Sequence, residues 1–223
     1  EYYIDKETPY FKEYAKEFTD MPFLVRVEDI NGAVQPGRFL NAKDLGRQEE
    51  GSDFHMVLID EITNEIVIPN GTMGERHTNP QKWNLRLENR DTGAKIDPRL
   101  SVFDQREDVT VVKLPYFGDE EHEGVIERAI PTITVQTVDG PVKVTTVYDL
   151  ILANYGIDRG IGGEVATSYT DDTPYTPTWQ EKITGVKADI AIATAREFAD
   201  NAEKTKGRSM IIMGGGINHW YHA

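Results

Sequence analysis

The chain contains no cysteine among its 223 residues. This absence excludes structural disulfides, zinc sites with cysteine ligands, iron–sulfur ligation from within the chain and a thiol nucleophile. Long apolar runs are also missing, because no stretch approaches the roughly 20 residues that a membrane-spanning helix needs. A chain of this size buries enough surface on folding to need no disulfide or metal cross-link.

Basic residues are outnumbered by acidic ones. The chain has 24 Lys and Arg against 38 Asp and Glu, which gives a formal net charge of −14. A protein that binds a nucleic-acid duplex needs a dense footprint of Lys and Arg to displace counterions. The composition therefore excludes nucleic acid as a partner, and it disfavours binding to an anionic membrane surface.

The two ends of the sequence do not resemble ordinary chain termini. There is no initiating Met and no signal peptide at Glu1, and the last residues form a polar and aromatic cluster. Natural termini are more often polar and frayed. We expect an internal fragment of a larger protein, and the alternative is a genuine aromatic C-terminus.

Periodicity divides the chain into three parts, with boundaries at 1–22, 23–147 and 148–223. In the first part, Thr8 as N-cap and Pro9 as first residue predict a short helix. Phe11, Tyr14, Ala15 and Phe18 would share one face of this helix, which ends in the segment 19–22 before Pro22.

The second part, 23–147, is rich in predicted strands. Hairpins are expected at Asn31-Gly32 and Asp139-Gly140, and strand 55–60 is expected to pair with 65–68. Residues 69–74 and 91–93 read as turns, and Pro36, Pro69, Pro115 and Pro131 are expected at strand ends or edges. Further strands are predicted at 23–28, 83–88, 109–114, 130–135 and 142–147. These strands indicate an antiparallel sheet or a sandwich-like unit.

The third part, 148–223, changes to a helical period. Helices are predicted at 148–155, 178–183 and 188–205, with a polar loop at 159–178 and stops at Gly156, Gly185 and Gly207. Ile190, Ala191, Ala195, Phe198, Ala199 and Ala202 mark the buried stripe of the last helix. The apolar run 209–213 predicts a strand buried on both faces, as in a parallel α/β sheet. The predicted fold class is therefore mixed, with a β-rich antiparallel insertion followed by an α/β segment.

The strongest candidate for a functional site follows this last strand. Glycines at the carboxyl end of a strand allow close backbone approach to a ligand and donate N–H groups to phosphate. Polar and aromatic side chains directly after them would hydrogen-bond and stack on a heterocycle. The residues concerned are Gly214, Gly215, Gly216, Asn218, His219, Trp220, Tyr221 and His222. The alternative is a glycine-rich turn with a packed aromatic cluster.

Other candidate chemistry is weaker. His219 and His222 are three residues apart and would share a helical face as metal ligands, but the HExxH pattern is absent, so hydrogen-bonded imidazoles are favoured. His55 reads as an ordinary strand residue, and His77 and His122 as loop residues. The acidic run 119–123 and the pair Asp171-Asp172 lack the spacing of a calcium loop and are interpreted as solvated. The residues alone define no self-contained active site.

Several blocks of the sequence carry a resemblance to a known family. The most specific are 197–205, 207–212 and 218–222; others are 19–22, 37–40, 69–71, 82–85, 115–118, 145–150, 153–156, 166–169 and 175–177. In this order they resemble the catalytic alpha subunit of membrane-bound respiratory nitrate reductases. These enzymes belong to the molybdopterin oxidoreductase superfamily related to dimethyl sulfoxide reductase.

The resemblance implies a slice of a longer subunit that reduces nitrate to nitrite at a molybdenum bis(molybdopterin guanine dinucleotide) cofactor. It implies a [4Fe–4S] cluster in the parent enzyme, an iron–sulfur beta subunit and a cytochrome b gamma subunit as partners. It places the parent at the cell membrane on the cytoplasmic face, or on the outer face as in archaeal relatives. The isolated slice is expected to bind no cofactor and to be inactive.

Within the slice, the resemblance makes 214–222 a cofactor-proximal loop. Gly214, Gly215 and Gly216 would give backbone donors to a pterin or pyrophosphate. Asn218, His219 and His222 would hydrogen-bond the pterin or the oxygen ligands of molybdenum, and Trp220 and Tyr221 would pack the wall. No catalytic residue and no metal ligand is assigned to the slice. The alternatives are a catalytically inert structural or subunit-docking module of another molybdopterin oxidoreductase, and an independent protein that binds a small ligand.

Overall fold

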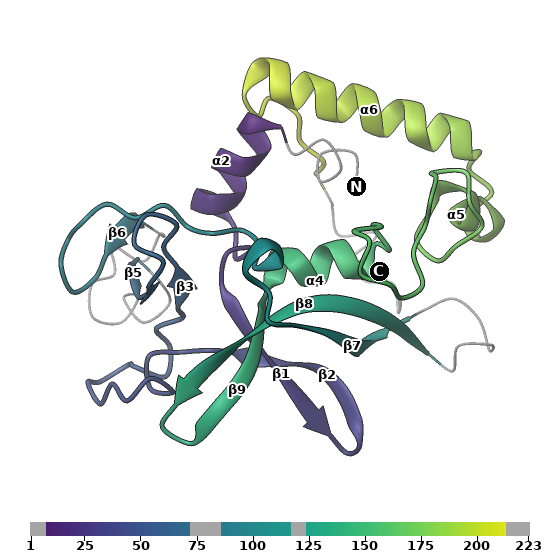
Figure 1. The fold of residues 1–223 in the computed structure, drawn as a ribbon. Helices are drawn as coiled ribbons and strands as arrows, with labels where there is room; N and C mark the ends of the chain where they lie inside the picture. The colour runs from purple at the N-terminus through teal and green to yellow at the C-terminus, as the bar shows by residue number, and fades with distance from the viewer. Residues whose placement is uncertain (1–7, 72–85, 117–123, 213–223) are drawn as a thin grey trace.

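A five-stranded antiparallel sheet forms the centre of the computed structural model, which describes residues 8–71, 86–116 and 124–212 (Figure 1). The strand order is β2-β1-β9-β8-β7. The outer strands β2 and β7 also contact each other, so the sheet curls. The strands are β1 Leu24–Ile30, β2 Ala33–Phe39, β7 Asp108–Pro115, β8 Val125–Thr137 and β9 Gly140–Thr146. The predicted antiparallel sheet is confirmed.

Both predicted hairpins are present. Asn31 and Gly32 have φ angles of 58° and 82°, the left-handed backbone that a two-residue turn between β1 and β2 requires. Thr137 pairs with Gly140 at the end of the β8–β9 hairpin. Local turn chemistry therefore fixes the register of two of the four strand pairs.

The position of Pro131 differs from the prediction. It lies buried within β8, an interior strand of the sheet, rather than at a strand end. It pairs with Val109 of β7, and the pairing of β8 with β9 begins two residues later at Ile133. Pro131 thus has a strand neighbour on one side only, where a missing N–H disrupts no second ladder. Pro36 on the outer strand β2 and Pro115 at the end of β7 agree with the prediction.

Two short strand pairs form a smaller lobe beside the sheet. β3 Leu58–Ile59 pairs with β4 Ile66–Val67, as predicted. β5 Pro69–Asn70 pairs with β6 Arg86–Asn89. The predicted turn beginning at Pro69 is therefore wrong for its first two residues, because their backbone pairs with β6. The 3-10 helix η1 Phe103–Gln105 leads from this lobe back to β7.

The helices follow the predicted boundaries closely. They are α2 Pro9–Phe18, α4 Val147–Asn154, α5 Pro177–Thr184 and α6 Ala188–Thr205. The side chain of Thr146 accepts the N–H of Asp149 at the start of α4, and Thr176 caps α5 in the same way through Trp179. Thr8, the predicted N-cap of α2, makes no side-chain cap bond. No described helix is long and apolar enough to span a bilayer.

Helix α4 lies against the curled sheet and helix α6 does not. Ala153 of α4 packs with Val112 and Ile130 of the sheet. Helix α6 reaches from α5 to the end of α2 and crosses above α4 (Figure 1). Its predicted buried stripe is correct only at Ala199 and Ala202, whereas Ile190 is 56% exposed. Phe198, and Tyr14 and Phe18 on α2, are exposed as well, because the described elements do not cover these faces.

The predicted buried strand at 209–213 is wrong for its described residues. Residues 209–212 form no strand, and Met210, Ile211 and Ile212 are 76%, 75% and 80% exposed. Met213 lies outside the described residues. Pairing partners and apolar cover are both needed for a buried strand, and the described part of the chain supplies neither at this position.

Candidate functional site

The predicted cofactor-proximal loop lies beyond the described residues. This applies to Gly214, Gly215, Gly216, Asn218, His219, Trp220, Tyr221 and His222. The structure describes the segment that precedes the loop in the chain, up to residue 212.

The chain direction after α6 is fixed by local hydrogen bonds. Lys206 and Gly207 both adopt left-handed backbone, with φ of 55° and 92°, and the N–H of Gly207 donates to the Ala202 carbonyl over 2.8 Å. Asn201 Nδ2 donates to the Arg208 carbonyl over 3.1 Å and to Ser209 Oγ over 2.7 Å. The helix end therefore orients the backbone up to Ser209, immediately before the exposed apolar run.

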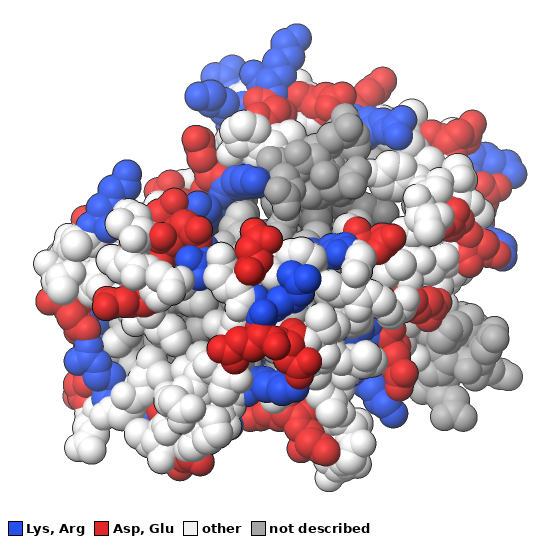
Figure 2. All heavy atoms as spheres, viewed as in Figure 1, with Lys and Arg blue, Asp and Glu red and all other residues white. Residues whose placement is uncertain are grey.

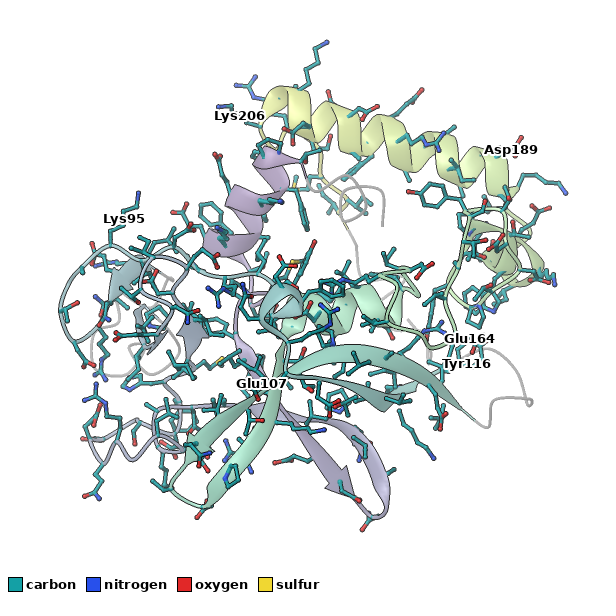
Figure 3. The ribbon with its side chains drawn as sticks, viewed as in Figure 1. Lys95, Glu107, Tyr116, Glu164, Asp189 and Lys206 are labelled. Atoms are coloured by element: carbon teal, nitrogen blue, oxygen red, sulfur yellow. The ribbon has the colours of Figure 1, made fainter. Side chains whose placement is uncertain are left out.

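Contacts with α2 hold the same corner. The N–H of Tyr10 donates to Glu203 Oε1 over 3.4 Å. A Cβ on residue 207 would collide with the Tyr10 hydroxyl, so any other residue there would require the Tyr10 side chain to move. Figure 3 shows Asp189 and Lys206 at opposite ends of α6, where an acidic N-terminus and a basic C-terminus both complement the helix dipole.

The histidine and acidic candidates that the structure describes make hydrogen bonds or ion pairs with neighbouring protein groups. His55 is 1% exposed, and Arg90 Nη1 lies 2.9 Å from its Nδ1. Asp171 accepts Thr167 Oγ1 over 2.8 Å and the N–H of Thr167 over 2.7 Å, and these hydrogen bonds lower the pKa of Asp171. Asp172 pairs with Lys182. His77, His122 and the acidic run 119–123 lie outside the described residues.

Two surface depressions flank the loop between α4 and α5. One has a volume of about 450 Å³ and is lined by residues 156–158 and 166–169. The other, of about 200 Å³, lies between α5 and α6, with Tyr169 and Tyr175 among its walls. Neither depression was expected from the sequence, because both depend on how the polar loop folds back.

An aromatic cluster anchors α5 to the sheet. Trp179 Nε1 donates to the Tyr116 hydroxyl over 2.9 Å, and the Tyr175 and Trp179 ring centroids are 5.2 Å apart. Tyr175 has a φ of 74°, an uncommon backbone for a bulky residue. Burial raises the pKa of its hydroxyl.

Arg128 is the main charged residue that sequence reasoning missed. It lies on β8 opposite Val112, and its side chain is 1% exposed. Burial lowers the pKa of its guanidinium, although the Glu164 carboxylate opposes the shift. Glu164 and Tyr116, labelled in Figure 3, lie near the same end of the sheet. The sequence could have indicated this burial, because alternate residues of a strand face the same side and Arg128 lies between the apolar residues Ile126 and Ile130.

Metal ligation was tested on the described residues. Among residues 8–71, 86–116 and 124–212, no group of three or more His, Asp or Glu side chains could hold a metal ion. The whole sequence has no cysteine for an iron–sulfur cluster. The described residues thus do not fit a metal centre, and no chemical step is assigned to them.

Figure 2 shows acidic and basic side chains interspersed over the face in view.

Comparison with known proteins gives relatives along the entire chain. A nitrate reductase alpha chain from Bacillus subtilis is 47% identical over 223 residues, which are 100% of this chain and 18% of the relative. Respiratory nitrate reductase 1 alpha chain from Escherichia coli is 43% identical over 235 aligned residues, again 100% of this chain and 19% of the relative. A perchlorate reductase subunit alpha from Dechloromonas aromatica is 28% identical over 225 residues, 99% of this chain and 18% of the relative. A scan against models of protein families gave no match.

These relationships define a class and then a narrower group. The chain is related over its whole length to alpha chains of oxyanion reductases. More narrowly, it corresponds to one segment of the nitrate reductase alpha chains, and the resemblance recognised in the sequence is confirmed. The chain spans about a fifth of the length of these relatives, at 18% and 19% for the two nitrate reductases above.

Proposed function

We propose that the chain is a segment of the catalytic subunit of a respiratory nitrate reductase, which reduces nitrate to nitrite. The observation that carries the proposal is the identity of 47% and 43% to nitrate reductase alpha chains, spread over the entire chain. The similarity to a perchlorate reductase subunit alpha is lower, at 28%. This ranking favours nitrate as the substrate.

The parent enzyme would hold a molybdenum bis(molybdopterin guanine dinucleotide) cofactor, which supplies two-electron oxygen-atom transfer. A [4Fe–4S] cluster, ligated outside this cysteine-free chain, would feed it electrons. The partners would be an iron–sulfur beta subunit and a cytochrome b gamma subunit at the cell membrane. The cytoplasmic face is proposed, with the outer face as the alternative.

The role of this chain would be to support and line the cofactor site. Gly214, Gly215 and Gly216 would donate backbone N–H groups, and Asn218, His219 and His222 would hydrogen-bond the pterin or the oxygen ligands of the metal. Trp220 and Tyr221 would pack the wall. The fixed end of α6 supports this role, because the hydrogen bonds of Asn201 orient the backbone that enters the loop.

The fold would be part of a molybdopterin oxidoreductase of the dimethyl sulfoxide reductase type. In that arrangement 1–22 is a helical segment, 23–147 a β-rich insertion with a scaffold or docking role, and 148–223 an α/β segment. The exposed side chains of Met210, Ile211 and Ile212 support an α/β context, since neighbouring strands of a longer polypeptide would cover them.

A His219→Ala change in the intact enzyme tests the proposed site. We expect nitrate turnover to fall by at least tenfold, because a group that orients the cofactor or its oxygen ligands is lost. Molybdenum content, measured in parallel, separates lost binding from lost orientation. His122→Ala, in the run interpreted as a solvated loop, is the matched control. Full turnover with normal cofactor content in His219→Ala would sink the assignment.

A second candidate is an inert structural or docking module of another molybdopterin oxidoreductase. The perchlorate reductase relative supports one part of this candidate, a parent enzyme other than a nitrate reductase. Assays of the intact enzyme with nitrate and perchlorate separate the two candidates. Turnover of nitrate supports the first, and turnover of perchlorate without nitrate supports the second.

A further inference from the structure

One edge of the Arg128 guanidinium has no hydrogen-bond partner among the described residues. Nη1 donates to the Glu164 carbonyl, whereas Nε and Nη2 are buried and make no hydrogen bond. The side chain is 1% exposed. Buried N–H donors on a charged group destabilise a fold unless they have a hydrogen-bond acceptor. We therefore expect an acceptor at this edge.

The geometry of the unpartnered edge selects the ligand. Nε and Nη2 lie on the same side of a planar fork, and their N–H bonds run parallel. Two oxygens of a planar oxyanion accept both bonds at once. A single water molecule accepts them less linearly and brings no charge.

The electrostatic surroundings favour a negative charge. Val112 lies opposite Arg128 on β7, and Ile126 and Ile130 flank it on the same face of β8. The nearest carboxylate oxygen, Oε2 of Glu164, is 3.6 Å from Nη1 on a side chain that is 42% exposed. The cation therefore sits among apolar side chains with a partly hydrated counter-charge on its other edge.

The unpartnered edge of Arg128 lies against the backbone at Gly156. A Cβ at residue 156 would lie 3.3 Å from Nη2 and 3.7 Å from the Ala166 nitrogen. Gly156 and Ala166 also line the 450 Å³ depression on their outer side. Asp158 is in the same lining, but its Oδ1 accepts the N–H of Gly160 over 2.9 Å. The N–H of Ala166 donates to the Gly156 carbonyl over 2.8 Å. Arg128 itself does not line the depression, so the backbone at Gly156 and Ala166 has to move before a ligand reaches the buried edge.

We propose that Arg128 binds a small free planar oxyanion of the size of nitrate on its Nε–Nη2 edge, entered from the depression between Gly156 and Ala166. The site uses none of the residues 214–222, and its existence does not depend on the proposed function.

Bromide soaks of crystals of the intact native polypeptide test the site. Bromide is the probe because its anomalous scattering identifies it. We expect a peak within hydrogen-bonding reach of both Nε and Nη2, and we expect a tenfold excess of sodium nitrate to remove it. Absence of the peak, an ordered water or a protein carboxylate in its place, or a peak that nitrate does not displace overturns the proposal.

Two variants of Arg128 separate the effect of its paired N–H donors from the effect of its positive charge. Arg128→Met removes both and should abolish the peak, and Arg128→Lys keeps the charge without the two-donor edge and should weaken it severalfold. Arg106→Met, at an exposed arginine over Phe103, should leave the peak unchanged. If Arg128→Met fails to fold, Arg128→Lys decides: an unchanged peak in Arg128→Lys contradicts recognition by the edge.

Discussion

Arg159 Nη1 donates to Asp149 Oδ1 over 2.5 Å, and the Asp149 side chain is completely buried. The same carboxylate accepts Ser101 Oγ over 2.6 Å, the N–H of Val102 over 2.9 Å and Thr146 Oγ1 over 2.8 Å. Asp149 therefore joins the end of β9, the start of α4, the segment before η1 and the loop after α4. All its acceptor positions face protein donors.

Asp149→Ala should lower the free energy of unfolding by about 3–5 kcal/mol, because it leaves the Arg159 guanidinium and buried donors without their acceptor. Urea unfolding of the chain measures the loss. Asp53→Ala, at an exposed aspartate, is the control and should change stability by less than about 0.5 kcal/mol. Equal effects of the two substitutions would contradict the central role of Asp149.

The carboxyl group of Asp60 makes the stability of the fold depend on pH. Burial raises the pKa of this carboxyl, but the N–H of Asp97 over 2.8 Å and Thr63 Oγ1 over 2.9 Å outweigh burial and hold the pKa below its usual range. The ionised form therefore stabilises the fold above the unfolded pKa of about 3.9, and this contribution is lost as the pH falls through the lower folded pKa. Asp60→Asn should lower stability at neutral pH and flatten the decline below about pH 4. Thermal unfolding from pH 3 to 7 measures both, and an unchanged acid slope contradicts the assignment.

Gly163 and Gly162 form a matched pair for separating crowding from backbone strain. Both have positive φ, 88° and 85°. A Cβ at 163 would lie 2.9 Å from the Ala129 nitrogen, whereas a Cβ at 162 meets nothing within 4 Å. Gly162→Ala should cost about 1–2 kcal/mol of stability from strain alone. Gly163→Ala should cost about 1–3 kcal/mol more, since β8 has to shift. Equal losses of unfolding free energy in the two variants would show that a side chain at 163 does not crowd β8.

Ile211 tests whether the exposed apolar run is an internal surface of a longer protein. Ile211→Asp should change the unfolding free energy of this chain by no more than about 0.5 kcal/mol, because the side chain is 75% exposed. In the intact enzyme the same change should reduce folded yield and nitrate turnover at least tenfold, since a charge would enter an apolar surface that the rest of the polypeptide covers. Ile211→Val is the conservative control and should preserve both. Normal yield and turnover of Ile211→Asp in the intact enzyme would remove this support for an α/β context.

Local patterns sufficed for the elements whose stabilising contacts lie close in sequence. Helix α6 was predicted over its observed range because its apolar spacing and Gly207 specify both the period and the end. The Asn31-Gly32 hairpin was equally predictable, since left-handed backbone at two adjacent positions selects these residues. The family resemblance also came from the sequence, and the relatives confirmed it.

Burial and partners were not predictable where they depend on distant chain. Residues 209–212 have the composition of a buried strand, yet burial requires neighbouring strands that the described residues do not contain. Pro131 lies inside β8 because that strand changes neighbours there, a property of the sheet and not of the residue.

The sequence by itself determined the periods, the turns, the acidic and cysteine-free character, and the relationship to nitrate reductase alpha chains. Only the tertiary structure decided that Arg128 has a buried two-donor edge beside Gly156, that Asp149 accepts four hydrogen bonds, and that α6 buries Ala199 and Ala202. The physical reason is that these features depend on contacts between segments up to 193 residues apart, and no local pattern records which segments meet.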